Sequence, residues 1–209
     1  SALTANTAGA NNVAVGHGSL DANTTASNNT AVGKDALKVS TTAANTVAVG
    51  VNAFSSLTYN GVPFNVAVGY GAGAAATNGY NLSLVGYNAG AAVTTGGNIS
   101  ALGSSALLSN TTGYSNVAMG TNTLRNNTTG ASNTGIGDSA LNANTTASNN
   151  TAVGYSALNA NTTGHENTMV GGISGNAKTT GVVNTGVGYN SLGATTTGSS
   201  NVAIGYDAL

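Results

Sequence analysis

The chain has 209 residues, of which 31 are glycine, and four basic and five acidic side chains give it a net charge of -1. Only 4% of the residues are charged, against about 25% in ordinary globular domains, which excludes nucleic-acid binding through phosphate contacts. There is no cysteine, so disulfides and thiolate metal sites are excluded. No apolar run approaches the ~18 uninterrupted residues of a membrane span, and we expect no membrane insertion of this segment.

A motif of the form NTAVG repeats along the whole chain. Its glycine stands at positions 16, 33, 50, 69, 86, 103, 120, 137, 154, 171, 188 and 205. The same 17-residue spacing therefore separates successive glycines throughout, except that a 19-residue unit lies between 50 and 69. A fixed short period is the signature of a solenoid. We interpret residues 1–209 as a single continuous repeat array.

Four columns of like residues appear when the units are aligned on this glycine. The residue before it is apolar in all twelve units, and the fourth residue after it is Leu or Phe in nine, with Gly73, Gly90 and Gly175 in the others. Asn stands four places before the glycine in nine units, while Asn45, Asn81 and Asn98 stand one place earlier in the remaining three. Thr stands eight places after it in all eleven complete units.

The residues before each glycine alternate in the manner of a strand. Thr30 and Val32 would share one face, and Ala31 and Gly33 the other. Seventeen positions that include turn residues leave room for two or three short strands, but not for a helix. A single coil of this size cannot offset its ordering entropy, so coils must stack on one another. The sequence predicts an all-β β-solenoid (a β-roll) of twelve 17-residue coils, in which Asn amides and Thr hydroxyls form ladders.

The 19-residue unit contains both phenylalanines and the single proline, within residues 51–65. Its residues Tyr59, Pro63 and Phe64 indicate a two-residue bulge or turn that departs from the ladder. An inert loop and a loop that carries specific recognition both fit these residues.

Tyrosine recurs directly after the glycine, in adjacent units at two places. The residues are Tyr70, Tyr87, Tyr155, Tyr189 and Tyr206. Stacked rings would stabilise neighbouring strands, while a strip of tyrosines could also contact sugars or surfaces, because Tyr has a flat apolar face and a hydroxyl.

No constellation of residues typical of catalysis or of cofactor binding is present. Residues 69–75 match the spacing of a dinucleotide-binding glycine loop, but these glycines are column positions of the repeat and no helix or acidic partner follows. His17 and His165 stand at different places in their units, and Glu166 is the only carboxylate adjacent to either. We expect no enzyme activity and no cofactor or metal site.

The alanine column beside the glycines would let another backbone approach closely. Two narrow apolar columns also make a thin core for a free-standing coil. We therefore expect several chains to pack along a common axis, most simply three.

The units NTAVGYSALNANTTG at 150–164 and NVAIGYDAL at 201–209 resemble the head repeats of YadA-like trimeric autotransporter adhesins. They are similar, too, to the 17-residue NTAIGYxALxxNTTGxx arrays of phage, viral and bacterial fibre proteins. The resemblance covers the whole chain, although the repeat units of adhesin heads are shorter than those found here. It implies a left-handed parallel β-roll that assembles as a trimer.

Together these features predict a non-enzymatic structural or adhesive fibre segment. Residues 1–3 and Leu209 fall within the repeat phase, which favours a piece of a longer fibre or a subunit stacked end to end in a filament. Such a segment would lie outside the cell, on a cell surface or on a virion, with itself as partner and a host-surface or glycan receptor as a further one. The alternative function is ice or surface binding by the Thr ladder.

Overall fold

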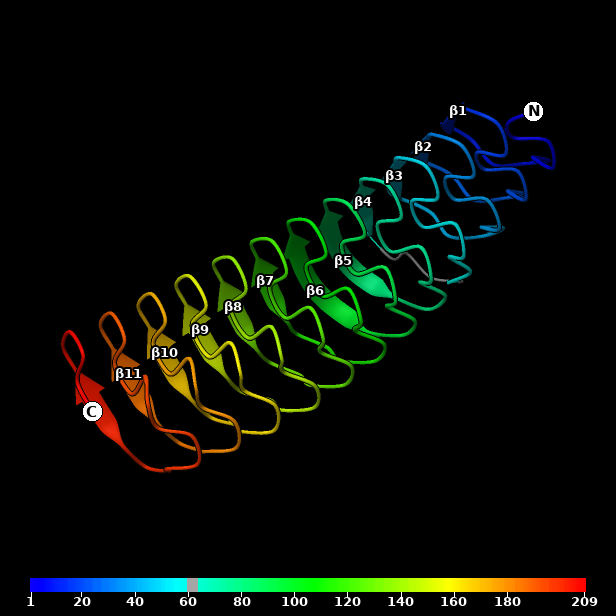
Figure 1. Cartoon of the computed structure of the whole chain (residues 1–209). Coiled ribbons are helices and arrows are strands. Elements are labelled where there is room, and N and C mark those ends of the chain that lie inside the picture. The colour runs from blue at the N-terminus through cyan, green and yellow to red at the C-terminus, as the bar shows by residue number, and fades with distance from the viewer. Residues whose placement is uncertain (60–63) are drawn as a thin grey trace.

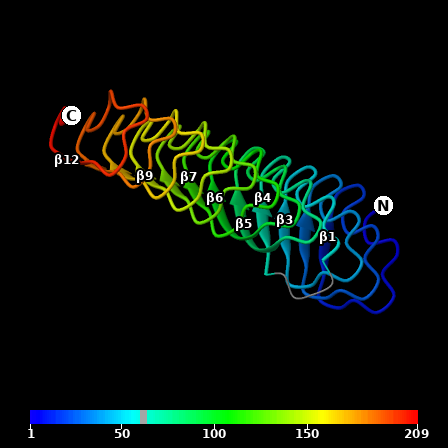
Figure 2. The ribbon, with the colours of Figure 1, turned by 90° about the horizontal axis from the view of Figure 1, so that it is seen from below.

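The chain winds into a long rod of stacked coils with its two ends far apart (Figure 1). The structure is a computed structural model, which describes residues 1–59 and 64–209. Viewed from below, the strands lie side by side along one wall of the rod (Figure 2). The strands are β1 (Val13–Val15), β2 (Thr30–Val32), β3 (Val47–Val49), β4 (Val66–Val68), β5 (Tyr80–Val85), β6 (Gly97–Leu102), β7 (Val117–Met119), β8 (Thr134–Ile136), β9 (Thr151–Val153), β10 (Thr168–Val170), β11 (Thr185–Val187) and β12 (Val202–Ile204).

The twelve strands form one parallel sheet in sequence order, β1 through β12. Each strand pairs with the residues 17 positions further on, as Ala14 pairs with Ala31, except that Val47 pairs with Val66 across the 19-residue unit. The predicted parallel β-solenoid with a 17-residue lap is therefore confirmed.

Within residues 1–59 and 64–209 each coil contributes one strand, so the prediction of two or three strands per unit was wrong there. The reason is a set of left-handed backbone positions that interrupt any extended run. In the second coil these are Leu20 (φ 48°), Asn28 (φ 63°) and, after the strand, Asp35 (φ 58°). The turns still stack, because their backbone groups bond to the next coil, as when Leu20 N donates to Ala36 O at 3.0 Å.

The glycine of the NTAVG motif ends every strand at a position that only glycine fits. Gly154 has φ +137°, and a Cβ built there would lie 2.4 Å from the carbonyl oxygen of Gly171 in the next coil. Neither the backbone angle nor the space admits a side chain. The same geometry recurs at Gly86, where the distance to Gly103 O is also 2.4 Å.

The alanine column points into the coil, which corrects the expectation that it would face another chain. Ala31, Ala48 and Ala152 are fully buried, and the leucine column lies buried opposite to them. The interior is narrow, so a small residue on the strand must face a large one on the turn. The apolar residues before the glycine are thereby turned outward.

Three units with glycine in the leucine column show how this narrow interior is filled. A Cβ on Gly90 would lie 2.9 Å from Leu84, which replaces the inward alanine of its strand. A Cβ on Gly175 would lie 3.0 Å from Met169, which does the same in β10. At Gly73 the space is filled by Phe54 and again by Leu84. In these units the large residue is on the strand and the small one is on the turn, so the total side-chain volume inside the coil is kept.

Candidate functional site

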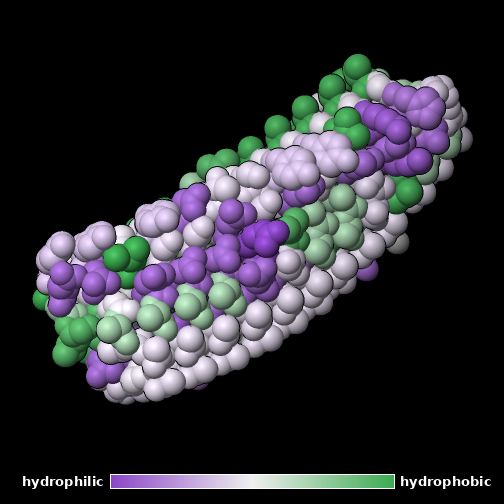
Figure 3. All heavy atoms as spheres, viewed as in Figure 1, coloured by the Kyte–Doolittle hydropathy of each residue, from purple (hydrophilic) through white to green (hydrophobic). Residues whose placement is uncertain are grey.

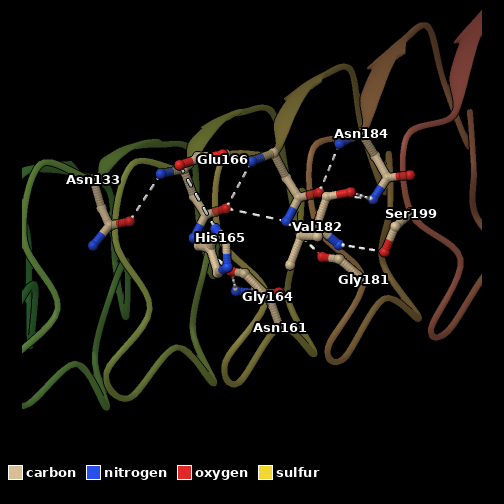
Figure 4. A network of polar contacts seen from close by, with 11 residues as sticks. Asn133, Asn161, Gly164, His165, Glu166, Gly181, Val182, Asn184 and Ser199 are labelled. Carbon is tan, nitrogen blue, oxygen red and sulfur yellow. Dashed lines mark hydrogen bonds and ion pairs between the residues drawn. The ribbon is translucent and has the colours of Figure 1, made fainter.

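A ladder of asparagines runs along the interior, four places before the glycine in nine of the twelve units. The backbone N–H of Asn150 donates to Oδ1 of Asn133 at 3.0 Å, and that of Asn167 donates to Oδ1 of Asn150 at 3.0 Å (Figure 4). Nδ2 donates to a turn carbonyl, as from Asn150 to Gly164 O at 2.8 Å, and in several coils it also donates to Oδ1 of the preceding asparagine, as from Asn167 to Asn150 at 3.2 Å. These side chains thus replace ladder bonds where the backbone turns away from the sheet. The predicted asparagine ladder is confirmed.

A second asparagine column faces the first across the turn. Asn161 donates from Nδ2 to Oδ1 of Asn144 at 3.0 Å and to the same carbonyl of Gly164 at 2.9 Å. Lys178 takes the next place in this column, is fully buried, and reaches one coil further to Gly198 O at 2.9 Å. Oδ1 of Asn161 is left without a hydrogen-bond partner among the described residues. Burial also lowers the pKa of the Lys178 amine, so Lys178 puts a disfavoured charge where Asn161 would otherwise have an amide neighbour.

The threonine column also forms a ladder, although not between hydroxyl groups. Oγ1 of Thr111 donates to the backbone oxygen of Thr128 at 3.1 Å, and Thr128 repeats the contact to Thr145 at 3.0 Å. These hydroxyl protons are used within the rod. The second threonine of each pair is the one that faces outward, and this exposed row contains Thr25, Thr42, Thr95, Thr112, Thr129, Thr146, Thr163, Thr180 and Thr197. Regular rows of pale side chains are visible along the rod in Figure 3.

The outward apolar column forms a row on the surface that we call the apolar stripe. It consists of the residues before each glycine, and all twelve are at least partly exposed: Val15, Val32, Val49, Val68, Val85, Leu102, Met119, Ile136, Val153, Val170, Val187 and Ile204. The exposed fraction runs from 36% at Val170 to 72% at Ile204 among the more exposed members. A broken row of hydrophobic side chains follows the upper edge of the rod (Figure 3). A stripe of this length on a water-exposed wall is typical of an interaction surface.

The tyrosines after the glycine are exposed, and their predicted stacking is present where units are adjacent. The rings of Tyr70 and Tyr87 lie 5.6 Å apart at 16°, and those of Tyr189 and Tyr206 lie 5.4 Å apart at 13°. In each pair the ring faces cover one another, which supports packing along the rod. Tyr155 has no aromatic neighbour in this column and is 64% exposed.

The 19-residue unit contributes further aromatic side chains to the surface. Tyr59 packs partly against the core, and Phe64 is 64% exposed. Pro63 lies outside the described residues. Sequence reasoning missed Tyr80 and Tyr114, which are exposed in nearby coils. The signal for Tyr80 was Gly97, which stands at the equivalent place in the following unit and leaves room for a ring.

The polar residues considered for chemistry do not come together. His165 Nδ1 lies 3.8 Å from Glu166 Oε1 in an exposed pair, and His17 is remote in the sequence. Residues 1–59 and 64–209 contain no cluster of metal-binding side chains, and their surface shows no pocket. The described part of the chain also contains no helix able to cross a membrane.

No model of a protein family matches the chain, and no curated protein or solved structure matches it. The fold therefore rests on the coil geometry, and the candidate functional surfaces are the apolar stripe, the exposed threonine row and the exposed aromatic side chains.

Proposed function

We propose that this chain is a structural segment of an extracellular fibre, in which copies pack side by side through the apolar stripe. It would act without catalysis, as part of an adhesin, a tail fibre or a free filament, at a cell or virion surface. The apolar stripe carries the proposal, since it presents a long apolar wall beside a sheet that carries very little charge. The stacked ladders supply the stiffness that such a fibre needs.

The size of the stripe fits an interface between copies. Eight of its twelve side chains are 36–72% exposed and the other four less so, which gives an apolar area on the order of the 800 Å² per partner of a stable interface. Like charges do not oppose this contact, because the stripe contains none. A straight, narrow stripe on one wall suits three rods around a common axis, and closed symmetry of this kind is usual for identical chains. The resemblance to adhesin head repeats favours the same trimer, with left-handed coils.

Sedimentation velocity tests the proposal. The chain is expected to sediment as a closed oligomer of three copies, and the triple variant Ile136→Lys/Val170→Lys/Val187→Lys as a monomer with an unchanged circular dichroism spectrum. The matched control places lysine on the exposed threonine row, as Thr129→Lys/Thr163→Lys/Thr180→Lys, and is expected to remain oligomeric. A monomeric parent chain would refute lateral packing, as would dissociation of the control variant alone.

Ice or surface binding is the second candidate, and the exposed threonine row is the observation that favours it. These threonines recur in nine of the eleven complete coils, with Tyr59 and Asn78 at this place in the other two, and they point outward. The inner ladder first considered for this role donates its hydroxyl protons within the rod. Thermal hysteresis in freezing solutions separates the candidates. It would be absent for a fibre segment, and present and abolished by the threonine-to-lysine variant for an ice binder.

A further inference from the structure

One tyrosine differs from the others in how its ring is held. Tyr80 begins β5 and pairs with Gly97, the first residue of β6. A Cβ built on Gly97 would lie 2.4 Å from Cζ and 2.5 Å from Cε1 of the Tyr80 ring. The ring therefore lies flat across the backbone of Gly97 and buries it, while Tyr80 itself remains 39% exposed. One ring face rests on the sheet, so the exposed part of Tyr80 lies on the side away from Gly97.

The stacked tyrosines are covered on one side by another ring and not by a glycine backbone. Tyr70 and Tyr87, which directly follow the motif glycine, lie nearly parallel at 5.6 Å, so each covers one face of the other. Beside Tyr80, the ring of Tyr59 lies at 6.4 Å with an angle of 30°. The two rings make a broader, shallow aromatic surface, which we call the Tyr80 platform.

Amide groups lie next to this platform. Asn81 follows Tyr80 directly and donates from Nδ2 to Oδ1 of Asn98 in the next coil at 2.9 Å. Both side chains are exposed, and no described residue accepts a hydrogen bond from Nδ2 of Asn98. A flat apolar face therefore adjoins a free amide donor at the surface.

The surroundings contain no charge. No acidic or basic residue occurs between Lys38 and Arg125 in the sequence, a span that includes both strands of the platform. Phosphate, sulfate and carboxylate groups would find no cationic partner here. An aromatic ring beside neutral amides instead suits a neutral ligand ring with one apolar face and hydroxyls at its edge.

We propose that the Tyr80 platform binds a pyranose ring of a neutral glycan. The apolar face of the sugar stacks on the open face of Tyr80, and its hydroxyls exchange hydrogen bonds with the amides of Asn81 and Asn98. The platform is complete within one chain, so this binding does not depend on lateral packing through the apolar stripe.

Saturation-transfer NMR with cellohexaose, maltohexaose and chitohexaose tests the proposal. At least one hexasaccharide is expected to receive saturation from the protein and to bind about tenfold more weakly to Tyr80→Leu, which keeps the apolar cover of Gly97 but removes the ring. Tyr80→Phe should bind within about twofold of the parent chain. Gly97→Ala should weaken binding although Tyr80 is intact, because its methyl displaces the ring.

Tyr87→Leu is the matched control, since it removes a tyrosine that is more exposed (55% against 39%) and whose ring is stacked on Tyr70, and its binding should be unchanged. Absence of transfer to all three hexasaccharides overturns the proposal, and so does equal binding by Tyr80→Leu. Sedimentation of the same samples keeps the two proposals apart. An oligomer that binds no hexasaccharide refutes the platform alone, and a monomer that binds one refutes lateral packing alone.

Discussion

The central coils and the C-terminal coils have different residues at the same interior position. In the C-terminal half, Asn133, Asn150 and Asn167 occupy the inner column, and their strands are three residues long. In the central coils this column holds Leu82 and Ile99, and β5 and β6 extend to six residues each. Where no amide can bridge adjacent coils, the backbones pair directly over a longer stretch. The lap has the same length in both regions, so the turn sets that length and the filling does not.

Substitution of the motif glycine should have the largest effect and should not distinguish the two regions. Gly86→Ala and Gly154→Ala each bring a Cβ within 2.4 Å of the next coil's carbonyl oxygen, at a cost of about 3–5 kcal/mol in unfolding free energy. Urea unfolding followed by circular dichroism measures this loss. Gly172→Ala is the control, because its Cβ would meet only a Tyr189 ring carbon at 3.3 Å. Tolerance at Gly86 but not at Gly154 would contradict a shared constraint.

The second-largest effect is expected where large and small residues have exchanged sides in the central coils. Leu84→Ala should lower the unfolding free energy by about 3 kcal/mol, since it leaves a cavity beside Gly90 and Gly73. The double variant Leu84→Ala/Gly90→Leu restores the arrangement of the other coils and should recover at least half of that loss. Thermal melting of the two variants side by side checks this. No recovery in the double variant would mean that the two sides of the coil are not complementary in volume.

Asn150→Leu places in a C-terminal coil the kind of apolar side chain that the central coils have at this position. The backbone N–H of Asn167 would lose its acceptor, Oδ1 of Asn150, and a buried unpaired N–H costs about 2 kcal/mol. Amide hydrogen exchange should then show faster exchange at Asn167. The exposed substitution Thr146→Ala should leave the exchange pattern unchanged. Unaltered protection in Asn150→Leu would show that the backbone can re-pair locally, as it does in β5 and β6.

Lys178→Asn should have the smallest effect, and it should stabilise. An asparagine here would give Oδ1 of Asn161 a donor and remove a buried amine, for a gain of about 1 kcal/mol near neutral pH. Burial lowers the pKa of Lys178 in the folded chain from its ordinary 10.5. The unfolded chain therefore binds the proton more strongly, and this site adds stability as the pH rises from the folded pKa towards 10.5.

The advantage of Lys178→Asn over the parent chain should accordingly shrink between pH 7 and pH 10. Lys178→Met, which removes the charge without restoring the amide, is the control that separates the two contributions. Urea unfolding at several pH values checks both. If the gain in unfolding free energy of Lys178→Asn does not change with pH, the restored hydrogen bond to Asn161 alone is responsible for it.

Much of the fold could be predicted because every coil repeats the same constraint. The 17-residue lap and the asparagine ladder follow from residue identity alone, since like residues must stack in register. The direction of the alanine and valine columns did not follow, because both are apolar. The missing argument was size, since Leu84 and Met169 appear on the strand only where the facing turn residue is glycine.

The number of strands and the aromatic surface were harder to predict. Left-handed φ values at leucines such as Leu20 have no signal in a residue type that seldom adopts them. Tyr80 stood out only after its pairing with Gly97 was known, because ring orientation depends on the neighbouring coil. The sequence shows which residues share a column, but it does not show which residue of the neighbouring coil each side chain contacts.

The 19-residue unit has a practical consequence. Thr58 N donates to Thr77 O across this unit at 3.0 Å, and Asn65 makes the usual bond to Gly79 O at 2.8 Å, so the extra length leaves the pairing intact on both sides. The rod thus accepts a unit that is two residues longer without transmitting a phase error to the coils beyond it. Foreign peptides could be inserted in such a unit at chosen heights along a rigid scaffold.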